Sequence, residues 1–301
     1  MQTREPVLGG IDAGGTSFRC IVASGPDRIL AEARFATTSP QETLTRAAAF
    51  FAEGPGREAE AIGIACFGPV AVDPRHPRHG TILTTPKAGW SDTDVLGPIR
   101  AATGRPVGIE TDVIAAALGE HRWGAGRGEG NLAYVTVGTG IGAGILSGGV
   151  PLHGALHPEA GHVHVPRHPA DLDFPGVCPF HGGCVEGLAS APALRARWGV
   201  DPADLPDDHP GWDIEAHYLA HLSATLVLVA AVRRVVLGGG VSARSGLVAR
   251  VADRTATLLA GYEAAFGAAG DTLVVAPGLG LRAGALGALA VAGSLLATGD
   301  R

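Results

Sequence analysis

Three potential metal ligands lie close together in the segment GVCPFHGGCVEG, residues 176–187: Cys178, His181 and Cys184. Zinc prefers thiolate and imidazole ligands, and structural zinc sites are tetrahedral with four protein ligands. We therefore expect a structural zinc ion that makes this loop rigid without a hydrophobic core of its own. A disulfide within the loop, or three side chains without a metal, are the alternatives.

The fourth zinc ligand must come from outside the loop, and the histidines before it supply candidates. Six of the chain's twelve histidines lie between residues 153 and 181. His162, His164 and His168 could each complete the set. A metal bound there would fix Glu186, just beyond the loop, so that its carboxylate points at a ligand as a hydrogen-bond acceptor.

A glycine-rich segment near the N-terminus has the residue types that bind a polyphosphate. In DAGGTSFR, residues 12–19, Asp12 ends a predicted strand and is followed by Gly14, Gly15 and Thr16. Glycine lets backbone N–H groups approach phosphate oxygens, and threonine adds a hydroxyl. The carboxylate of Asp12 could hold Mg²⁺ through water. Taken alone, the segment is equally compatible with a tight hairpin turn.

A second segment, VGTGIGAG at residues 137–144, repeats the pattern with Gly138, Thr139 and Gly140. A strand follows where a dinucleotide-binding fingerprint requires a helix, and neither segment has the GK[ST] of a Walker A loop. Two such hairpins in corresponding places predict a nucleotide held between two lobes. A third segment, LGGGVSAR at 237–244, could pack against a base or ribose, or form a simple strand-to-helix turn.

Asp112 lies between a predicted strand and an alanine-rich helix in IETDVIAAALGE, residues 109–120. An acid in this place is often the N-cap of the helix, because its oxygen accepts a free backbone N–H. The alternative is a general base in the cleft between two lobes, which accepts the proton of an attacking hydroxyl.

The hydrophobic pattern predicts an α/β protein with two similar lobes around a cleft. Units of strand, glycine turn and strand begin near residues 7 and 132, and each opens a series of strands and helices. We place the N-terminal lobe at 1–114 and the C-terminal lobe, with the zinc loop, at 115–280. The C-terminal helix, about 281–301, could pack on either lobe.

Composition indicates a globular protein without a nucleic-acid or membrane partner. The chain has 301 residues, 17% charged residues and a net charge of −6, which argues against a nucleic-acid surface. The most apolar stretch, at 224–232, is too short to span a bilayer. The N-terminal sequence has no apolar segment typical of a signal peptide, so we expect a cytoplasmic protein whose four cysteines are thiols or metal ligands.

Taken together, these segments resemble the ROK sugar kinases, which have the actin/hexokinase-like (ribonuclease H-like) ATPase fold. The resemblance rests on the paired glycine segments, the ExGH at Glu159–His162, the Cys/His loop followed by VEGLAS, and the LGGGV turn. It covers nearly the whole chain in order. GPVAVDPRHPRHGTILTTPKAGWSDTDV at 68–95 and CPFHGGCVEGLAS resemble the fructokinase branch in particular.

The resemblance implies a role for individual residues. Asp112 aligns with the catalytic base. The positions aligned with sugar contacts are Thr111, Glu159, His162 and Glu186. Those aligned with zinc ligands are His162, Cys178, His181 and Cys184. Those aligned with contacts to ATP are Asp12, Gly14, Gly15, Thr16, Gly138, Thr139, Gly140, Gly238, Gly239 and Gly240. The chain departs from the family at Ser17, where a lysine is usual, and at Ile114, where an asparagine is usual.

The expected activity is ATP- and Mg²⁺-dependent phosphorylation of a hexose, with D-fructose giving fructose 6-phosphate, by a homodimer. The alternatives are a related kinase acting on mannose, glucose or an N-acetylhexosamine, and a non-catalytic sugar-binding protein. The family also contains sugar-sensing transcriptional regulators with a DNA-binding region before the first glycine segment. Here that segment begins by residue 9 and the chain is acidic, so we do not expect a transcriptional regulator.

Overall fold

The computed structural model describes residues 5–262 and 273–298. Contacts divide the chain into two compact units, Met1–Trp123 with Leu281–Arg301, and Gly124–Gly280, called unit 1 and unit 2 below. The boundary predicted after residue 114 falls inside helix α3 (Asp112–Trp123). This helix packs against the C-terminal helix α8 (Ala283–Thr298), so both belong to unit 1. Residues 299–301 of the predicted helix lie outside the described residues.

Unit 1 is built on a five-stranded sheet with the order β3-β2-β1-β4-β5. The strands are β1 (Leu8–Ala13), β2 (Ser17–Ala23), β3 (Ile29–Ala36), β4 (Ala61–Cys66) and β5 (Val107–Thr111). Strands β1, β2 and β3 form an antiparallel meander, whereas β4 and β5 continue parallel to β1. The first glycine segment is the turn between β1 and β2.

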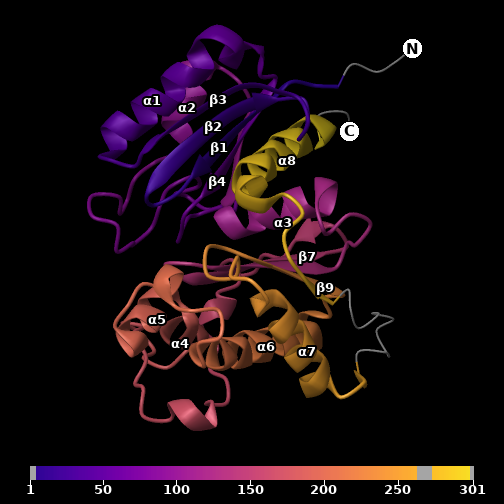
Figure 1. The fold of residues 1–301 in the computed structure, drawn as a ribbon. Helices are drawn as coiled ribbons and strands as arrows, with labels where there is room; N and C mark the ends of the chain where they lie inside the picture. The colour runs from indigo at the N-terminus through magenta and orange to yellow at the C-terminus, as the bar shows by residue number, and fades with distance from the viewer. Residues whose placement is uncertain (1–4, 263–272, 299–301) are drawn as a thin grey trace. The chain divides into compact units, whose positions relative to one another are not determined.

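Helices cover both faces of this sheet (Figure 1). Helices α1 (Pro40–Ala52) and α2 (Leu96–Thr103) pack on one face, together with the short 3₁₀ helix η1 (Gly54–Glu58). Helix α8 lies on the other face, against glycines of β1, β4 and β5. A Cβ at Gly63 of β4 would lie 1.9 Å from the carbonyl oxygen of Ala288, so only glycine permits this close approach.

Helix α8 is apolar along its whole length. Residues Gly280–Ala297 are long and apolar enough to cross a membrane by composition, but half of this stretch is buried within the structure. Its contacts with β1, β4, β5 and α3 account for that composition, because a helix packed between a sheet and another helix has apolar neighbours on most sides. It is the core helix of unit 1.

Unit 2 repeats the sheet of unit 1. Its strands are β6 (Leu132–Val137), β7 (Ile141–Ser147), β8 (Val150–Pro151), β9 (Arg234–Gly238) and β10 (Val274–Val275), in the order β10-β9-β6-β7-β8. Strands β6, β7 and β8 form the antiparallel meander, and β9 and β10 continue parallel to β6. The prediction of one architecture used twice is confirmed, and the second glycine segment is the turn between β6 and β7.

Unit 2 carries a long insertion between β8 and β9. Its helices are α4 (Val185–Ala189), α5 (Ala191–Trp198) and α6 (Gly211–Ala230), with the 3₁₀ helices η2 (Ala160–His162), η3 (Pro169–Asp171) and η4 (Pro202–Asp204). Helix α7 (Leu247–Leu259) follows β9, and η7 (Gly280–Arg282) precedes α8. The apolar stretch predicted at 224–232 lies mostly in α6, the central helix of the unit 2 core.

Candidate active site

The four predicted zinc ligands form one cluster in unit 2. Single ligand atoms of His162, Cys178, His181 and Cys184 all lie within 4.8 Å of one another. Cys178 Sγ is 3.8 Å from His162 Nδ1 and 3.6 Å from His181 Nδ1, and Cys184 Sγ is 3.6 Å from His162 Nδ1. Nitrogen and sulfur ligands bound at about 2.0 and 2.3 Å on a tetrahedral zinc ion would lie about 3.5 Å apart. The residues present therefore fit a zinc ion.

Backbone pairing brings the distant fourth ligand to the loop. The N–H of Val185 donates to the carbonyl of Val163, next to His162, at 3.0 Å. A short antiparallel bridge joins Cys178 and Gly182, which has a φ of +56°. Of the three histidines that the sequence left open, the structure brings His162 into the ligand group.

Cys184 has a second structural contact, as the N-cap of helix α4. Its sulfur accepts the backbone N–H of Gly187 at 3.4 Å. A thiolate at this position also interacts favourably with the positive end of a helix. Glu186 lies in the first turn of the same short helix, two residues after Cys184, so its position depends on where this cysteine and the helix lie.

Glu186 contacts the second glycine turn. Its Oε2 accepts the backbone N–H of Ile141 at 2.9 Å. A Cβ at Gly140 would lie 2.7 Å from the same oxygen, so the absence of a side chain at Gly140 makes room for the carboxylate. The structure thus places a predicted sugar contact beside a predicted ATP contact.

Glu159 is the second carboxylate of this region, one residue before helix η2. Burial raises the pKa of Glu159, nearby His162 opposes that rise, and the carboxylate of Glu186 adds to it. Its Oε1 lies 3.3 Å from Nδ1 of His157, whose own pKa burial lowers. Glu159, His162 and Glu186 are therefore close enough to interact electrostatically.

In unit 1, hydrogen bonds tie the first glycine turn to the end of β3. Gly14 N–H donates to the carbonyl of Ser17 at 3.2 Å, and Thr37 N–H donates to the carbonyl of Thr16 at 3.0 Å. The hydroxyl of Thr37 donates to the carbonyl of Gly14 at 2.7 Å. Asp12 precedes this turn, and burial raises its pKa to about 6 although Arg19 and Arg34 pull it down.

Asp112 is the first residue of α3, directly after β5. Thr111 Oγ1 accepts the N–H of Ile114 at 3.3 Å, which is the hydrogen bond of an N-cap residue. Asp112 Oδ1 accepts the N–H of Val113 at 2.9 Å, and its charge adds to the burial that raises the pKa of the Cys66 thiol. Thr111, and not Asp112, is therefore the N-cap of α3. Thr111 is buried, and its contact with a sugar stays a prediction. Ile114 is fully buried.

Packing explains two of the three glycines at 238–240. A Cβ at Gly238 would lie 2.2 Å from the hydroxyl oxygen of Tyr134, and one at Gly239, with φ +94°, would lie 2.3 Å from the carbonyl oxygen of Val137. A Cβ at Gly240 would have no neighbour within 4 Å among the described residues. The close approach of this turn to β6 accounts for Gly238 and Gly239, and their contact with ATP stays a prediction.

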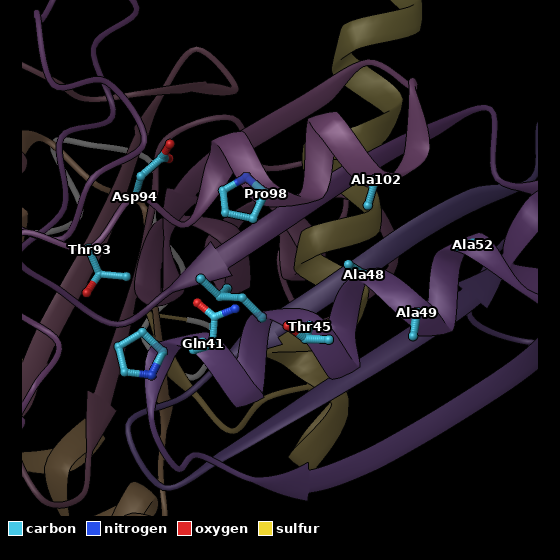
Figure 2. Close-up of a pocket in the computed structure, with 11 residues that line it drawn as sticks. Gln41, Thr45, Ala48, Ala49, Ala52, Thr93, Asp94, Pro98 and Ala102 are labelled. Atoms are coloured by element: carbon cyan, nitrogen blue, oxygen red, sulfur yellow. The ribbon is translucent and has the colours of Figure 1, made fainter.

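A groove of about 640 Å³ lies between helices α1 and α2, away from the predicted site (Figure 2). Small and apolar side chains form most of its lining, with Asp94 as its acidic residue. It is on the face of the unit 1 sheet opposite α8, whereas Asp12 lies against Gly284 of α8. None of the predicted site residues lines it.

One charged residue beside the first glycine turn, Arg34, is not among the residues predicted from the sequence. It lies in β3, directly opposite Arg19 of β2, which in turn lies opposite Asp12 of β1. The signal was the strand register: once three neighbouring strands are aligned, residues directly opposite one another share a face of the sheet.

Comparison with known proteins gives consistent matches over nearly the whole chain. The ROK family matches residues 8–294. A fructokinase from Zymomonas mobilis subsp. mobilis is 43% identical over 97% of this chain and 98% of its own. The ROK hexokinase from Thermus thermophilus has a TM-score of 0.78 at 31% identity, covering 98% of this chain and 100% of that one. A ROK family glucokinase from Streptomyces griseus, solved with glucose and AMPPNP, has a TM-score of 0.71 at 26% identity, covering 96% and 99%.

Proposed function

The chain belongs to the ROK family, and from this premise we propose that it phosphorylates D-fructose to fructose 6-phosphate. It is an ATP-dependent hexose kinase with the actin/hexokinase-like ATPase fold, as the sequence predicted. The observation that carries the choice of fructose is the match to a fructokinase at 43% identity over almost the full length of both chains. The glucokinase with bound glucose and AMPPNP supports a small-molecule hexose and a nucleotide as the two ligands.

The groups proposed to hold the triphosphate are the two glycine turns. Backbone N–H groups of Gly15 and Thr16, and of Thr139 and Gly140, would approach the phosphate oxygens. The N–H groups of Gly14 and Gly138 donate within the turns, to the carbonyls of Ser17 and Gly140, so these two glycines would contribute by allowing close approach. Asp12 would hold Mg²⁺ through water. The magnesium ion would neutralise charge on the phosphate oxygens as the bond to the leaving group breaks.

Asp112 is the proposed general base. The hydroxyl on C6 of the sugar attacks the γ-phosphorus in line, a new oxygen–phosphorus bond forms, and the bond to the bridging oxygen of ADP breaks. The hydroxyl proton passes to the carboxylate of Asp112. Thr111 Oγ1, and not Asp112, accepts the N–H of Ile114, while the Asp112 carboxylate accepts the N–H of Val113 through Oδ1.

The proposed sugar contacts in unit 2 are Glu159, His162 and Glu186. His162 turns Nδ1 toward the two thiols, which leaves Nε2 as the nitrogen able to donate to a sugar hydroxyl. Carboxylates accept hydrogen bonds from hydroxyls, so Glu159 and Glu186 suit the remaining positions. Thr111 stays a proposed contact through its hydroxyl hydrogen.

A structural zinc ion on His162, Cys178, His181 and Cys184 is proposed from the ligand separations. Its chemistry there would be structural: four protein ligands close the coordination sphere, and the ion fixes the loop that carries His162 and precedes Glu186. The 3.6 to 3.8 Å spacing between sulfur and nitrogen supports this assignment, and Cys178 and Cys184 form no disulfide in the structure.

A homodimer and a cytoplasmic location complete the proposal. The dimer comes from the family resemblance alone. All four cysteines are free thiols in the structure, which suits a reducing compartment. Sedimentation of the purified protein over a concentration series would test the dimer.

The experiment that tests the function is ADP release measured with ATP, Mg²⁺ and a panel of fructose, mannose, glucose and N-acetylglucosamine. Fructose is expected to give the highest kcat/KM. Asp112→Asn should keep the fold and lower kcat by about 10²- to 10⁴-fold, because the amide cannot accept the proton. Near-normal turnover of a folded Asp112→Asn protein would refute the assigned base. Binding of fructose without phosphate transfer in the wild-type protein would establish a sugar-binding protein instead.

A further inference from the structure

A row of three charged residues crosses the unit 1 sheet beside the first glycine turn. Asp12 of β1 pairs with Arg19 of β2, and Arg19 pairs with Arg34 of β3. Directly opposite residues on neighbouring strands project from the same face, with their Cβ atoms about 5 Å apart. The face is the one that α8 covers, since a Cβ at Gly284 of α8 would meet Asp12 Oδ2 at 2.7 Å.

The two arginines of this row have different partners. Arg19 lies 3.4 Å from the carboxylate of Glu32 and donates to the carbonyl of Leu281, and its side chain is 19% exposed. Arg34 is exposed, and among the described residues it forms no ion pair with a carboxylate. Arg34 therefore acts on Asp12 through space without forming a salt bridge, whereas Arg19 is paired with Glu32.

A serine of the glycine turn holds Arg34 in place. Nε and one terminal nitrogen of Arg34 donate to Ser17 Oγ at 3.3 and 3.2 Å. Ser17 closes the turn, because its carbonyl accepts the N–H of Gly14. The guanidinium thus lies at the segment proposed to hold phosphate, bound to a neutral hydroxyl.

A phosphate oxygen is a better acceptor for this guanidinium than a serine hydroxyl. Hydrogen bonds between a cation and an anion are shorter and about twice as strong as neutral ones. The planar fork of arginine also matches two phosphate oxygens at once. The other terminal nitrogen has no hydrogen-bond acceptor within the described residues, so the guanidinium can bind phosphate without leaving Ser17.

We propose that Arg34 binds the terminal phosphates of ATP at the first glycine turn, and that Ser17 is the residue that positions it. The inference rests on the proposed function, in which this turn binds the triphosphate. It adds to that function a cationic side chain from β3, outside the glycine segment itself.

The sheet offers a matched control for Arg34. Phe35 follows it in β3 and faces the opposite side of the sheet, where the guanidinium of Arg46 lies 4.5 Å from the centre of its ring. Arg46 is a residue of α1. It is exposed, as Arg34 is, but it lies on the opposite side of the sheet from Arg34. Arg46→Gln removes the same charge from the same unit without touching the phosphate turn.

The test compares Arg34→Gln, Arg34→Lys, Ser17→Ala and Arg46→Gln with the wild-type enzyme. Arg34→Gln should raise the KM for ATP by about tenfold or more, as for the loss of a hydrogen bond between charged groups, and leave the KM for fructose unchanged. Arg34→Lys should restore part of the affinity, since it keeps the charge and loses the fork. Ser17→Ala should raise the KM for ATP by a few fold with little change in kcat. Arg46→Gln should match the wild type.

Calorimetric binding of AMP, ADP and ATP gives a readout that is independent of turnover. Arg34→Gln should bind AMP like the wild type and bind ADP and ATP more weakly, because only the longer nucleotides carry the terminal phosphates. Equal effects of Arg34→Gln and Arg46→Gln, or an equal loss for all three nucleotides, would overturn the proposal. If the wild type binds nucleotides but phosphorylates no hexose, the proposed function fails and the binding series still decides the role of Arg34.

Discussion

At the residue scale, Asp12 is proposed to hold Mg²⁺ as a carboxylate, but its surroundings disfavour the charged form. Burial raises its pKa to about 6 from 3.8, in spite of Arg19 and Arg34. A folded-state pKa above the unfolded value means that stability is lost as pH rises through that interval. At pH 8 the charge of Asp12 therefore opposes folding.

Asp12→Asn should separate stability from activity. The neutral amide removes the buried charge, so at pH 8, without nucleotide or Mg²⁺, the free energy of unfolding should stay equal or rise by about 1–3 kcal/mol. ADP release should fall strongly, because the amide is a poor partner for the hydrated metal. Urea unfolding and the coupled assay measure the two quantities. A variant that loses stability and keeps its turnover would contradict the assigned role.

The role of Asp112 could not be decided from the sequence alone. The sequence could place it between a strand and a helix but could not choose between a cap and a base. Thr111 and Asp112 are both good capping residues, and the first residue of a helix is uncertain by one or two positions in any sequence analysis. The bond from Ile114 N–H to Thr111 Oγ1 makes Thr111 the N-cap, and it depends on where β5 ends. The role of Asp112 as the base stays a proposal.

At the scale of elements, the position of helix η2 against β7 depends on one close backbone approach, at Gly161. A Cβ at Gly161 would lie 1.7 Å from the carbonyl oxygen of Ile141, so any side chain would push the segment with His162 away from β7. Gly161→Ala should destabilise the protein by about 1–3 kcal/mol and raise the KM for fructose. Gly154→Ala is the control, since its nearest neighbour would be 3.9 Å away. Thermal unfolding of both variants tests this, and equal stability would show that the loop adapts freely.

The Cys/His loop gives a second prediction at this scale. Metal analysis of the purified protein should find about one zinc per chain, and Cys184→Ser should remove most of it. The fructose KM should then rise by about tenfold or more, because Glu186 follows Cys184 in helix α4 and loses its anchor. Cys20→Ser is the control, because Cys20 is a buried thiol in β2 of unit 1. A wild-type protein without zinc, unaffected by a chelator, would rule out the metal.

The sequence predicted three of the four candidate zinc ligands from spacing alone, because these three lie within one short segment. It could not choose the fourth from the residues themselves, because His162, His164 and His168 are similarly distant along the chain. The choice depends on pairing between Val163 and Val185, a tertiary contact that no local pattern encodes. The resemblance to a family pointed to His162, and the geometry agrees.

At the scale of the whole molecule, one five-stranded pattern is used twice, and the sequence revealed it through two glycine hairpins. The strand orders of the two units correspond strand by strand. What differs is the connection before the fourth strand: α1 and η1 in unit 1, and the long insertion with the Cys/His loop in unit 2. The contact-defined units place α3 with α8, a helix distant from it in sequence, and the two helices pack through small residues. A Cβ at Gly287 would lie 2.0 Å from the carbonyl oxygen of Ala115.

Glu215 links protonation to the stability of the whole protein. It lies fully buried in α6, and neither carboxylate oxygen has a hydrogen-bond partner within the described parts of the chain. Burial raises its pKa well above the ordinary 4.5, although Arg197 opposes the rise. The folded state thus keeps a proton that the unfolded chain loses, so stability should be greatest below about pH 4.5 for this group and fall as pH rises through the folded-state pKa.

Glu215→Gln should flatten this dependence, since the amide carries no titrating proton. Between pH 5 and pH 9 the wild type should lose more stability than the variant, by an amount on the order of 1–3 kcal/mol for a buried polar group without a partner. Urea unfolding across that range measures the difference, with Glu53→Gln on the exposed end of α1 as the control. Parallel pH profiles for the wild type and Glu215→Gln would mean that the buried carboxyl does not change its protonation on unfolding. A steeper profile for the wild type alone would identify Glu215 as the group through which rising pH weakens the fold.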